Sequence, residues 1–329
     1  MHAIRLYEFG PAENLLYEEV PDPVPGEGQV RVDVAASGVH VVDTRLREGP
    51  VGGPFPAPRL PTVPGREAAG VVGAVGPGTD PEWVGRRVVV HLGAAGTGGY
   101  AERVVADAAS LHVLPDHVAA DTAVAMIGTG RTTIGMLDRA ALNPDDVVLV
   151  TSAAGGMGSL SVQAAHAIGA TVVALAGGAA KTALARRLGA DIAVDYLDGD
   201  WPARVRAELG DREVTVALDG VGGDTGAAVL GLLGGGGRIV LHGYSASAGE
   251  PTRLTTADLA ERGLSAVWAV GPHIVRLAGG MRALETRALA ELAAGRLVPP
   301  VTAFPLKDAA RAHTALENRE TTGKVVLTS

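Results

Sequence analysis

The sequence predicts an α/β protein with two parts, a mostly β segment followed by a doubly wound parallel sheet with helices between its strands. Three observations carry this prediction. Short apolar runs separated by glycine and proline turns fill residues 1 to about 115, and helical and strand-like runs alternate after that point. A glycine turn joins the first strand of the alternating region to a helix. At 329 residues, 47% of them hydrophobic, the chain is long enough for two cores.

The first part reads as a compact β domain. Val30, Val32 and Val34 alternate with Arg31 and Asp33, which is the period-two pattern of a strand with one buried face. Proline clusters between the apolar runs indicate loops. The predicted strands are 3–6, 16–19, 29–35, 70–75 and 87–91.

The second part begins with a predicted helix at 119–137. Strands follow at 147–150, 171–176, 192–195, 214–218, 238–242 and 264–267, with helices at 181–188 and 225–233 and a turn at 234–237. Six such strands would complete a dinucleotide-binding sheet. The tail holds helices at 281–295 and 309–317 and a strand at 324–327, and we expect it to close back onto the first part. The expected domains are therefore 1–118 with 270–329, and 119–269.

Composition excludes several classes of function. The net charge is −8 and no segment concentrates Lys or Arg, so we expect neither nucleic acid nor an anionic membrane as a partner. The uncharged stretch 147–180 is interrupted by glycines and polar residues, which fits a buried βαβ unit better than a membrane span. The N-terminus resembles no secretory signal, so a cytoplasmic location is expected. The absence of cysteine excludes disulfides, thiolate zinc sites and a cysteine nucleophile.

The glycine turn is the strongest single indication of function. The segment 153–158, Ala-Ala-Gly-Gly-Met-Gly, matches the dinucleotide fingerprint with Ala in place of the first Gly. Glycines let the backbone bend sharply and approach a pyrophosphate, which the N–H groups at a helix start can bind. The alternative interpretation is an ordinary tight connection between a strand and a helix. The preceding strand and the uninterrupted helix that follows favour cofactor binding.

The sequence after the second strand bears on the choice of cofactor. An NAD site normally offers Asp or Glu about 20 residues past the fingerprint, to bind the ribose 2′-hydroxyl. Here 176–178 is Ala-Gly-Gly, and the next acidic residue is Asp191, beyond another helix. Lys181 and the arginine pair 186–187 stand where a 2′-phosphate could be met, although the pair also fits a solvated helix face. The sequence therefore favours NADPH over NADH.

Further motifs run along the whole chain. They are SGVHVVDTRLREG at 37–49, VPGREAAG at 63–70, GGYAE at 98–102, LGAD at 188–191 and TGKVVL at 322–327. With the fingerprint, they resemble the zinc-independent quinone oxidoreductases of the medium-chain dehydrogenase/reductase superfamily. The resemblance implies a GroES-like β domain and a Rossmann domain, in agreement with the pattern above. It also implies a homodimer formed through an edge of the Rossmann sheet, near 264–270.

The resemblance implies a set of cofactor contacts. Lys181 would supply a cation for phosphate, Tyr196 a hydroxyl, and Arg319 a fork for an oxyanion. Tyr196 also reads as a half-buried aromatic at a strand end, and Arg319 as a surface charge. The full set carried over from the family is Thr132, Gly155, Gly156, Met157, Gly177, Lys181, Tyr196, Gly243, Ser245 and Arg319.

The resemblance also indicates chemistry without a metal. Zinc-dependent alcohol dehydrogenases of this superfamily use a Cys after Gly-Val and the His of Gly-His-Glu, and here those places hold His40 and Arg66. An arginine does not ligate zinc at ordinary pH. The lobe that carries structural zinc in those enzymes has no counterpart here. We therefore predict no metal site.

Two departures from the family concern the candidate catalytic residues. The family usually has Asn at the position of His40 and often Tyr at that of Arg45. His40 could donate a proton to a reduced carbonyl oxygen, or it could simply satisfy a backbone group. Arg45 is the second catalytic candidate, and Asp43 is expected to be a structural carboxylate that caps the following turn.

Together these features predict an NADPH-dependent oxidoreductase. Hydride would pass to a small electrophilic acceptor, a quinone or an α,β-unsaturated carbonyl, and His40 or water would protonate the oxygen that gains charge. Two alternatives stay open at this point. One is a protein that binds NADPH for a structural or sensing role without catalysis, and the other is a zinc-dependent NAD alcohol dehydrogenase.

Overall fold

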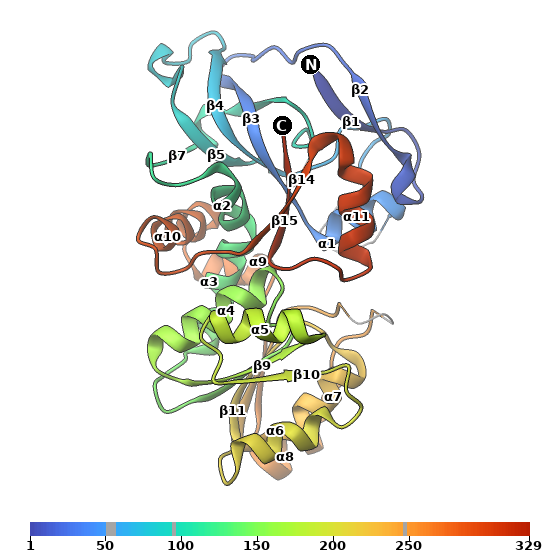
Figure 1. Ribbon diagram of the computed structural model, residues 1–329. Helices are drawn as coiled ribbons and strands as arrows, with labels where there is room; N and C mark the ends of the chain where they lie inside the picture. The colour runs from blue at the N-terminus through green and yellow to red at the C-terminus, as the bar shows by residue number, and fades with distance from the viewer. Residues whose placement is uncertain (51–56, 94–96, 246–248) are drawn as a thin grey trace. The chain divides into compact units, whose positions relative to one another are not determined.

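The computed structural model describes residues 1–50, 57–93, 97–245 and 249–329 (Figure 1). The chain forms two compact units, Met1–Gly130 with Glu285–Ser329, and Arg131–Leu284. The sequence pattern placed these boundaries earlier, at 118 and 269. Of the C-terminal tail, residues 285–329 belong to the first unit and residues 270–284 to the second.

The first unit is built on a seven-stranded sheet. Its strand order is β14-β15-β3-β4-β5-β7, with β6 pairing the same strand β3. The short strands β6, β7 and β14 escaped the sequence analysis. The bounds are β3 (Gln29–Val39), β4 (Glu67–Val75), β5 (Arg87–His91), β6 (Arg103–Asp107), β7 (His112–Val113), β14 (Val301–Pro305) and β15 (Lys324–Thr328), and a separate antiparallel pair joins β1 (His2–Leu6) and β2 (Leu15–Glu19).

Strand register brings three distant segments of the first unit together. β15 runs antiparallel to β3 with Val325 opposite Val39, so Lys324 stands beside the end of β3 where His40 follows. On the other side of β3, Ser37 lies opposite Ala68. Glu67, the first residue of β4, therefore lies at this same end. Side chains from residues 40, 67 and 324 can meet although they are far apart in sequence.

The predicted helix 119–137 is wrong as a single element. The chain forms α2 (Ala120–Ala125), then a buried π-helical turn over Met126–Gly130, then α3 (Arg131–Ala140). Turns of this kind often occur at functional sites. The helix α1 (Val41–Glu48), also unpredicted, directly follows β3.

The second unit is the predicted doubly wound sheet. Its strand order is β10-β9-β8-β11-β12-β13, and each pair of neighbours is parallel. Numbered from β8, this is the order 3-2-1-4-5-6 of dinucleotide-binding folds. The strands are β8 (Val147–Val150), β9 (Thr171–Ala176), β10 (Ile192–Asp195), β11 (Val214–Asp219), β12 (Leu233–Leu241) and β13 (Ser265–Trp268).

Helices bury both faces of this sheet (Figure 1). In β8, Val148 and Val150 pack in one hydrophobic cluster, and Val147 and Leu149 pack in another. All four are buried, because a parallel sheet covered by helices on two sides has no solvent face. The helices of this unit after α3 are α4 (Gly156–Ile168), α5 (Ala179–Arg187), α6 (Trp201–Leu209), α7 (Gly223–Leu232), α8 (Thr256–Arg262) and α9 (Pro272–Leu277).

Two predictions for the second unit are wrong. The glycines 234–237, predicted as a turn, lie within β12, whose pairing with β11 shifts register between Val214 and Val216. The helices α6, α8 and α9 were missed. The remaining elements are α10 (Met281–Ala293), α11 (Ala309–Glu317) and the short 3₁₀ turns Ala12–Asn14, Pro81–Trp83, Ala108–Ser110 and Leu306–Asp308.

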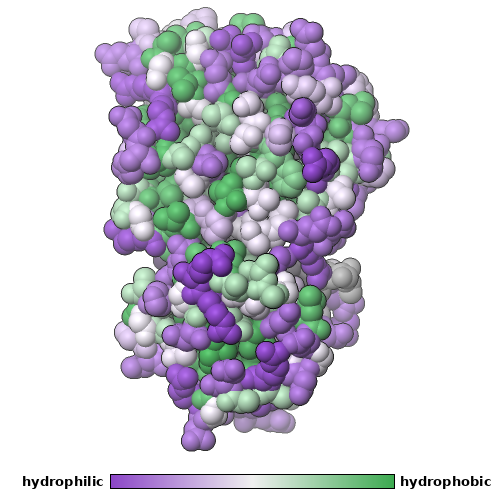
Figure 2. All heavy atoms as spheres, in the orientation of Figure 1, coloured by the Kyte–Doolittle hydropathy of each residue, from purple (hydrophilic) through white to green (hydrophobic). Residues whose placement is uncertain are grey.

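On the face drawn in Figure 2, hydrophilic side chains are interspersed with smaller hydrophobic areas. Within the described ranges, none of the helices has the length and apolar character needed to cross a bilayer.

Candidate active site

A carboxylate with no exposed surface lies at the start of β4 in the first unit. The Glu67 side chain sits between the backbones of Gly38, on β3, and Gly128, in the π-helical turn. A Cβ at either glycine would overlap a carboxylate oxygen, Oε2 at Gly38 and Oε1 at Gly128. Both glycines are needed so that the backbone can approach the carboxylate this closely.

Two nitrogen-bearing side chains share this carboxylate. Nε2 of His40 lies 2.7 Å from Oε1 of Glu67, and Nζ of Lys324 lies 3.2 Å from Oε2. The two nitrogens also lie 2.8 Å from each other. The Lys324 side chain is 5% exposed and that of Glu67 is 0%, whereas the His40 side chain is 21% exposed. Of these three side chains, His40 alone offers appreciable surface to solvent.

The electrostatics of this cluster favour an ionised Glu67. Burial by itself would raise the pKa of the Glu67 carboxyl, but the neighbouring His40 and Lys324 outweigh it, so that this pKa lies well below its usual value. For Lys324, burial lowers the pKa of the ammonium, and the attraction of Glu67 opposes that effect only in part. The ammonium of Lys324 therefore holds its proton less tightly than an exposed lysine does.

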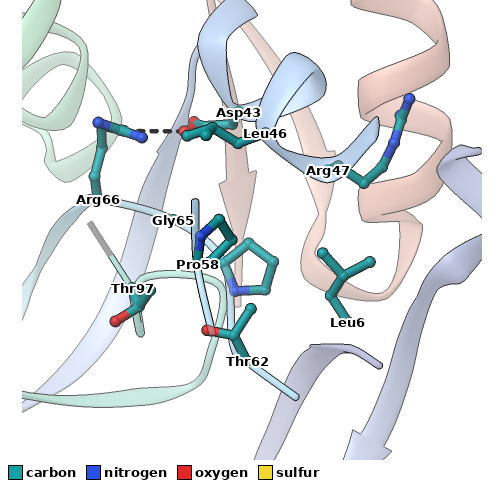
Figure 3. A pocket seen from close by; sticks show the side chains of 10 residues that line it. Leu6, Asp43, Leu46, Arg47, Pro58, Thr62, Gly65, Arg66 and Thr97 are labelled. Atoms are coloured by element: carbon teal, nitrogen blue, oxygen red, sulfur yellow. Dashed lines mark hydrogen bonds and ion pairs between the residues drawn. The ribbon is translucent and has the colours of Figure 1, made fainter. Parts of the chain in front are cut away.

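A second buried carboxylate, Asp43, organises the start of α1. Its Oδ2 accepts from the backbone N–H of His40 at 2.8 Å, and its Oδ1 is 2.9 Å from Nε of Arg66. Tyr100 donates its hydroxyl to Oδ2 at 3.4 Å. Figure 3 shows the Arg66 guanidinium directed at Asp43, whereas the Arg47 side chain points toward α11, where it pairs with Glu317 at 2.8 Å. Asp43 is thus the structural cap that the sequence predicted.

The cavity beside this pair is small. It has a volume of about 30 Å³ and is lined by Asp43, Arg66, Thr97 and seven other residues of the first unit (Figure 3). A cavity of this size is large enough to hold water. It has no room for a quinone ring.

A buried histidine lies behind Asp43. Nε2 of His313, on α11, is 3.1 Å from the hydroxyl of Tyr100, and no hydrogen-bond partner for its Nδ1 is found in the described part of the chain. Burial, aided by Arg47, lowers the pKa of His313 to about 4, although Asp43 opposes this. Burial also raises the pKa of Tyr100 well above its usual value. Both groups are therefore neutral at pH 7.

The two predicted catalytic residues lie in different surroundings. His40 belongs to the cluster with Glu67 and Lys324. Arg45 lies on the exposed side of α1, and its side chain makes no hydrogen bond or ion pair with the described residues. A catalytic role for Arg45 stays a prediction.

No role for Glu67, Lys324, Tyr100 or His313 was predicted from the sequence. The first three lie in the family motifs given above. Each is a polar residue among small or apolar neighbours in a strand-like segment, and this pattern could have drawn attention to them. Ionisable residues in such places are expected to be paired when buried.

The glycine turn of the second unit has the shape its sequence predicts. Gly155 is the N-cap of α4 and has extended backbone angles. A Cβ at Gly158 would overlap the carbonyl oxygen of Ser152, so the third glycine allows the helix to pack closely against the turn. Gly156 and Met157 form the first turn of α4, where free backbone N–H groups can bind an anion. These residues fit a dinucleotide pyrophosphate.

Other predicted cofactor contacts gather at the same edge of this sheet, where parallel strands end. Gly177 follows β9, and a Cβ there would lie 3.1 Å from the hydroxyl oxygen of Tyr196, which follows β10. Gly243 and Ser245 follow β12, and the N–H of Ser245 donates to the carbonyl of Gly220 at 3.0 Å. Ligands of open α/β sheets bind at this edge.

The remaining predicted contacts lie on other elements. Lys181 is half-buried in α5, and Thr132 lies in the first turn of α3. Arg319 belongs to the first unit, where it is exposed just after α11 and has a positive φ of 58°. The roles of all ten residues in binding a cofactor stay predictions.

One acidic residue near Gly177 was overlooked. Asp195 ends β10, and its Oδ1 accepts from the backbone N–H groups of Gly178 at 2.9 Å and Leu197 at 3.0 Å. These backbone donors lower the pKa of the Asp195 carboxyl. An acid that binds the ribose is expected at the end of β9, whereas Asp195 reaches the start of α5 from the neighbouring strand β10.

Comparisons with known proteins agree with both units. Residues 26–116 match the family model of the alcohol dehydrogenase GroES-like domain, and residues 156–283 match that of the zinc-binding dehydrogenases. The 2-haloacrylate reductase of a Burkholderia species is 32% identical over 98% of this chain and 97% of its own length. This chain belongs to the quinone oxidoreductase family of the medium-chain dehydrogenase/reductase superfamily. It is accordingly an oxidoreductase of that superfamily with a GroES-like and a Rossmann domain, as predicted.

Solved structures of this superfamily superpose on the whole chain. The quinone oxidoreductase of Escherichia coli complexed with NADPH has a TM-score of 0.84 at 30% identity, covering 100% of both chains. A structure described as an NAD-dependent alcohol dehydrogenase has a TM-score of 0.86 at 32% identity, also covering 100% of both. The fold is therefore shared by relatives whose descriptions name different nicotinamide cofactors.

The residues at the zinc-ligand positions of the superfamily, and their neighbours, disfavour the binding of a metal ion here. Arg66 is committed to Asp43, and the ammonium of Lys324 already stands within 3.2 Å of both His40 and Glu67. Within the described residues, no group of three or more His, Cys, Asp or Glu side chains is arranged to hold a metal ion. A divalent cation beside His40 would be repelled by Lys324.

Proposed function

We propose that this chain is an NADPH-dependent reductase that transfers a hydride to a quinone or an α,β-unsaturated carbonyl without a catalytic metal ion. The observation that carries the proposal is the glycine turn between β8 and α4, on the first strand of the 3-2-1-4-5-6 sheet. A nicotinamide dinucleotide bound there supplies the hydride. Gly155, Gly156 and Met157 would hold its pyrophosphate through backbone N–H groups.

The proposed acceptor follows from what the first unit can supply. Hydride addition to a conjugated carbonyl or quinone leaves negative charge on an oxygen, and the protein must stabilise or protonate that oxygen. His40 offers an ionisable ring that is partly exposed, with the positive charge of Lys324 beside it. The names of the relatives support a conjugated acceptor, since they include quinone oxidoreductases and a 2-haloacrylate reductase.

The preference for NADPH rests on α5. Lys181 in its first turn supplies a cation near Gly177, and β9 ends without an acid that would repel a 2′-phosphate. Asp195 opposes this preference, but its charge is partly neutralised by two backbone N–H groups. The NADPH complex of the E. coli relative supports the proposal, and the NAD-dependent relative defines the alternative.

Binding and turnover measurements test this proposal. Purified protein is titrated with NADPH and with NADH, with nicotinamide fluorescence as the readout, and then assayed with a panel of quinones, enones and saturated ketones. We expect a Kd for NADPH at least tenfold lower than that for NADH, and oxidation of NADPH by conjugated acceptors. Tight binding with no turnover would instead support a structural or sensing role. Failure to bind either nucleotide would refute the proposal altogether.

Zinc-dependent alcohol oxidation is the alternative suggested by the zinc-binding family description. The pairing of Arg66 with Asp43 and the ammonium of Lys324 favour the metal-free mechanism. Metal analysis of protein purified without chelators decides between the two. Stoichiometric zinc, together with oxidation of alcohols by NAD, would overturn the metal-free proposal.

We further propose a homodimer formed through β13. This strand lies at the end of the sheet and, among the described residues, pairs with β12 alone. Ser265, Ala266 and Trp268 are exposed on it, and an open edge with such residues is a template for strand pairing. Light scattering after size exclusion should give twice the chain mass, and Ala266→Lys should shift the protein toward monomer. A monomeric wild-type protein would contradict this proposal.

A further inference from the structure

The cluster of His40, Glu67 and Lys324 holds more ionisable groups than protonation of one oxygen requires. The three side chains come from the ends of β3, β4 and β15, and two of them are almost completely buried. A buried lysine and a buried glutamate are costly to desolvate, and an ion pair of this kind contributes little net stability over apolar residues. The arrangement of Lys324 and Glu67 around one nitrogen of His40 suggests that they take part in proton transfer.

The geometry at Nε2 of His40 allows two arrangements of protons. This nitrogen is 2.8 Å from Nζ of Lys324 and 2.7 Å from Oε1 of Glu67. A ring nitrogen carries either a lone pair or a proton, so it can accept from the ammonium or donate to the carboxylate, but not both. A proton that moves from Nζ to Nε2 therefore exchanges one favourable contact for the other, with the heavy atoms in place.

The surrounding charges keep this exchange balanced. Glu67 stays ionised, and the pKa of Lys324 is lowered by burial. Asp43 and Arg66, which also act on Lys324, form their own ion pair at 2.9 Å. His91 lies opposite Glu67 on β5 and adds its influence to the carboxylate. Among these groups, Lys324 is the one whose proton lies against Nε2.

We propose that Lys324 is a buried proton store that acts through His40. The proposal rests on the proposed function, in which His40 protonates the oxygen of the reduced acceptor. In this step the Nδ1–H bond of His40 breaks as the new O–H bond forms, and an Nζ–H bond of Lys324 breaks as an Nε2–H bond forms. The substrate oxygen loses its negative charge and Lys324 its positive charge, so atoms and charge balance. Neutral His40 then donates Nε2–H to Glu67.

The store is refilled by the reverse path. His40 is the partly exposed member of the cluster, so a proton from water enters through its ring and passes from Nε2 to the neutral amine of Lys324. Glu67 holds the ring in place and stabilises each positively charged state. No oxidant or reductant is needed beyond the hydride donor of the proposed function.

The key variants separate charge from proton transfer. Lys324→Arg keeps a cation beside Glu67, but a guanidinium does not give up its proton in proteins. We expect kcat for an enone to fall at least tenfold at pH 7.5, with the KM and the Kd of NADPH changed less than threefold. In a His40→Asn background, Lys324→Arg should cause no further loss, because the path from Lys324 to substrate is already broken. A kcat within twofold of wild type, or an equal loss in both backgrounds, would overturn the proposal.

A second readout does not depend on turnover. Nitrogen NMR of ¹⁵N-histidine-labelled protein, with the His40 signal assigned by its loss in His40→Asn, reports which ring nitrogen carries a proton. At pH 8 we expect Nε2 of His40 unprotonated in the wild type and in Lys324→Arg, where a cation donates to it. In Lys324→Met we expect Nε2 protonated, because Glu67 is then its remaining partner. If Nε2 of His40 has the same protonation in the wild type and in Lys324→Met, the proposal that Lys324 stores a proton is wrong, even if the protein reduces enones. The expected switch in a protein without reductase activity would instead refute the proposed function alone.

Discussion

Nζ of Lys324 lies 2.8 Å from Nε2 of His40, across 284 residues of sequence. The contact exists because β15, near the end of the chain, inserts beside β3 in the sheet of the first unit. Both side chains reach the carboxylate of Glu67, which two glycines make room for.

The close approach of Gly128 to Glu67 predicts that a single added methyl group strongly destabilises the folded protein. In Gly128→Ala the new Cβ would overlap Oε1 of Glu67, so either the π-helical turn or the carboxylate must move. We expect a loss of about 2–4 kcal/mol in the free energy of unfolding, measured by urea denaturation. Gly231→Ala is the matched control, since it is exposed in α7 with open space around its Cβ, and should be neutral or stabilising by up to about 1 kcal/mol. Equal effects of the two substitutions would contradict the packing described here.

The buried pair of Asp43 and Arg66 predicts a second effect on stability. Asp43→Asn keeps the shape of the side chain and an acceptor for the N–H of His40, but removes the charge that faces Arg66. Breaking a buried pair in this way costs about 3–5 kcal/mol. Glu82→Gln removes one charge of an exposed pair with Arg86 and should change thermal stability little. Thermal unfolding of the two variants side by side measures the difference, and an Asp43→Asn protein as stable as the control would show that Arg66 does not depend on Asp43.

His313 predicts acid sensitivity. Its pKa is lowered to about 4 in the folded protein and is near 6.5 when unfolded, so the unfolded state binds more protons between these values. The stability due to neutral His313 is therefore complete above pH 6.5 and is lost as the pH falls through 4, by about 3 kcal/mol in all. His313→Gln should flatten the fall in unfolding free energy between pH 7 and pH 4.5, whereas the exposed His117→Gln should leave it as in wild type. His242, whose pKa burial also lowers to about 4, keeps titrating in both variants. A wild-type pH dependence in His313→Gln would contradict the prediction.

The start of α5 predicts how the two nicotinamide cofactors are distinguished. Lys181→Gln should raise the Kd of NADPH about tenfold and leave that of NADH nearly unchanged, because the 2′-phosphate is the group that needs the cation. Asp195→Asn should act in the opposite sense and lower the Kd of NADPH relative to that of NADH, since it removes a negative charge held at Gly178. Fluorescence titration of both variants with both nucleotides checks this. Parallel changes for NADPH and NADH would show that neither residue faces the 2′ position.

Much of the second unit followed from local pattern. The strands Thr171–Ala176 and Ile192–Asp195 were predicted with the bounds they have, because a parallel strand buried on both faces is a short continuous apolar run. The glycine turn was recognisable because its three glycines are needed where the backbone bends sharply and packs closely. By contrast, the run of glycines 234–237 reads locally as a turn, and it lies within a strand because Leu233 before it and Arg238 after it both pair with β11.

The candidate site in the first unit was harder to predict. The residue types at positions 40 and 66 indicated that zinc ligands are missing, and that inference needs no coordinates. No local pattern associates Lys324 with His40, because antiparallel pairing between strands far apart in the chain sets that distance. The break in the predicted helix 119–137 has a similar cause, since a buried carboxylate from β4 lies against Gly128.

The sequence by itself determined the order of elements, the dinucleotide turn, the family and the absence of cysteine ligands, because each depends on residue type and short-range spacing. Only the tertiary structure decided that Glu67 and Lys324 surround His40, that Asp43 neutralises Arg66, and that Asp195 reaches Gly178. Those relationships depend on strand register and burial, which bring charges together across long stretches of chain and which no local pattern specifies.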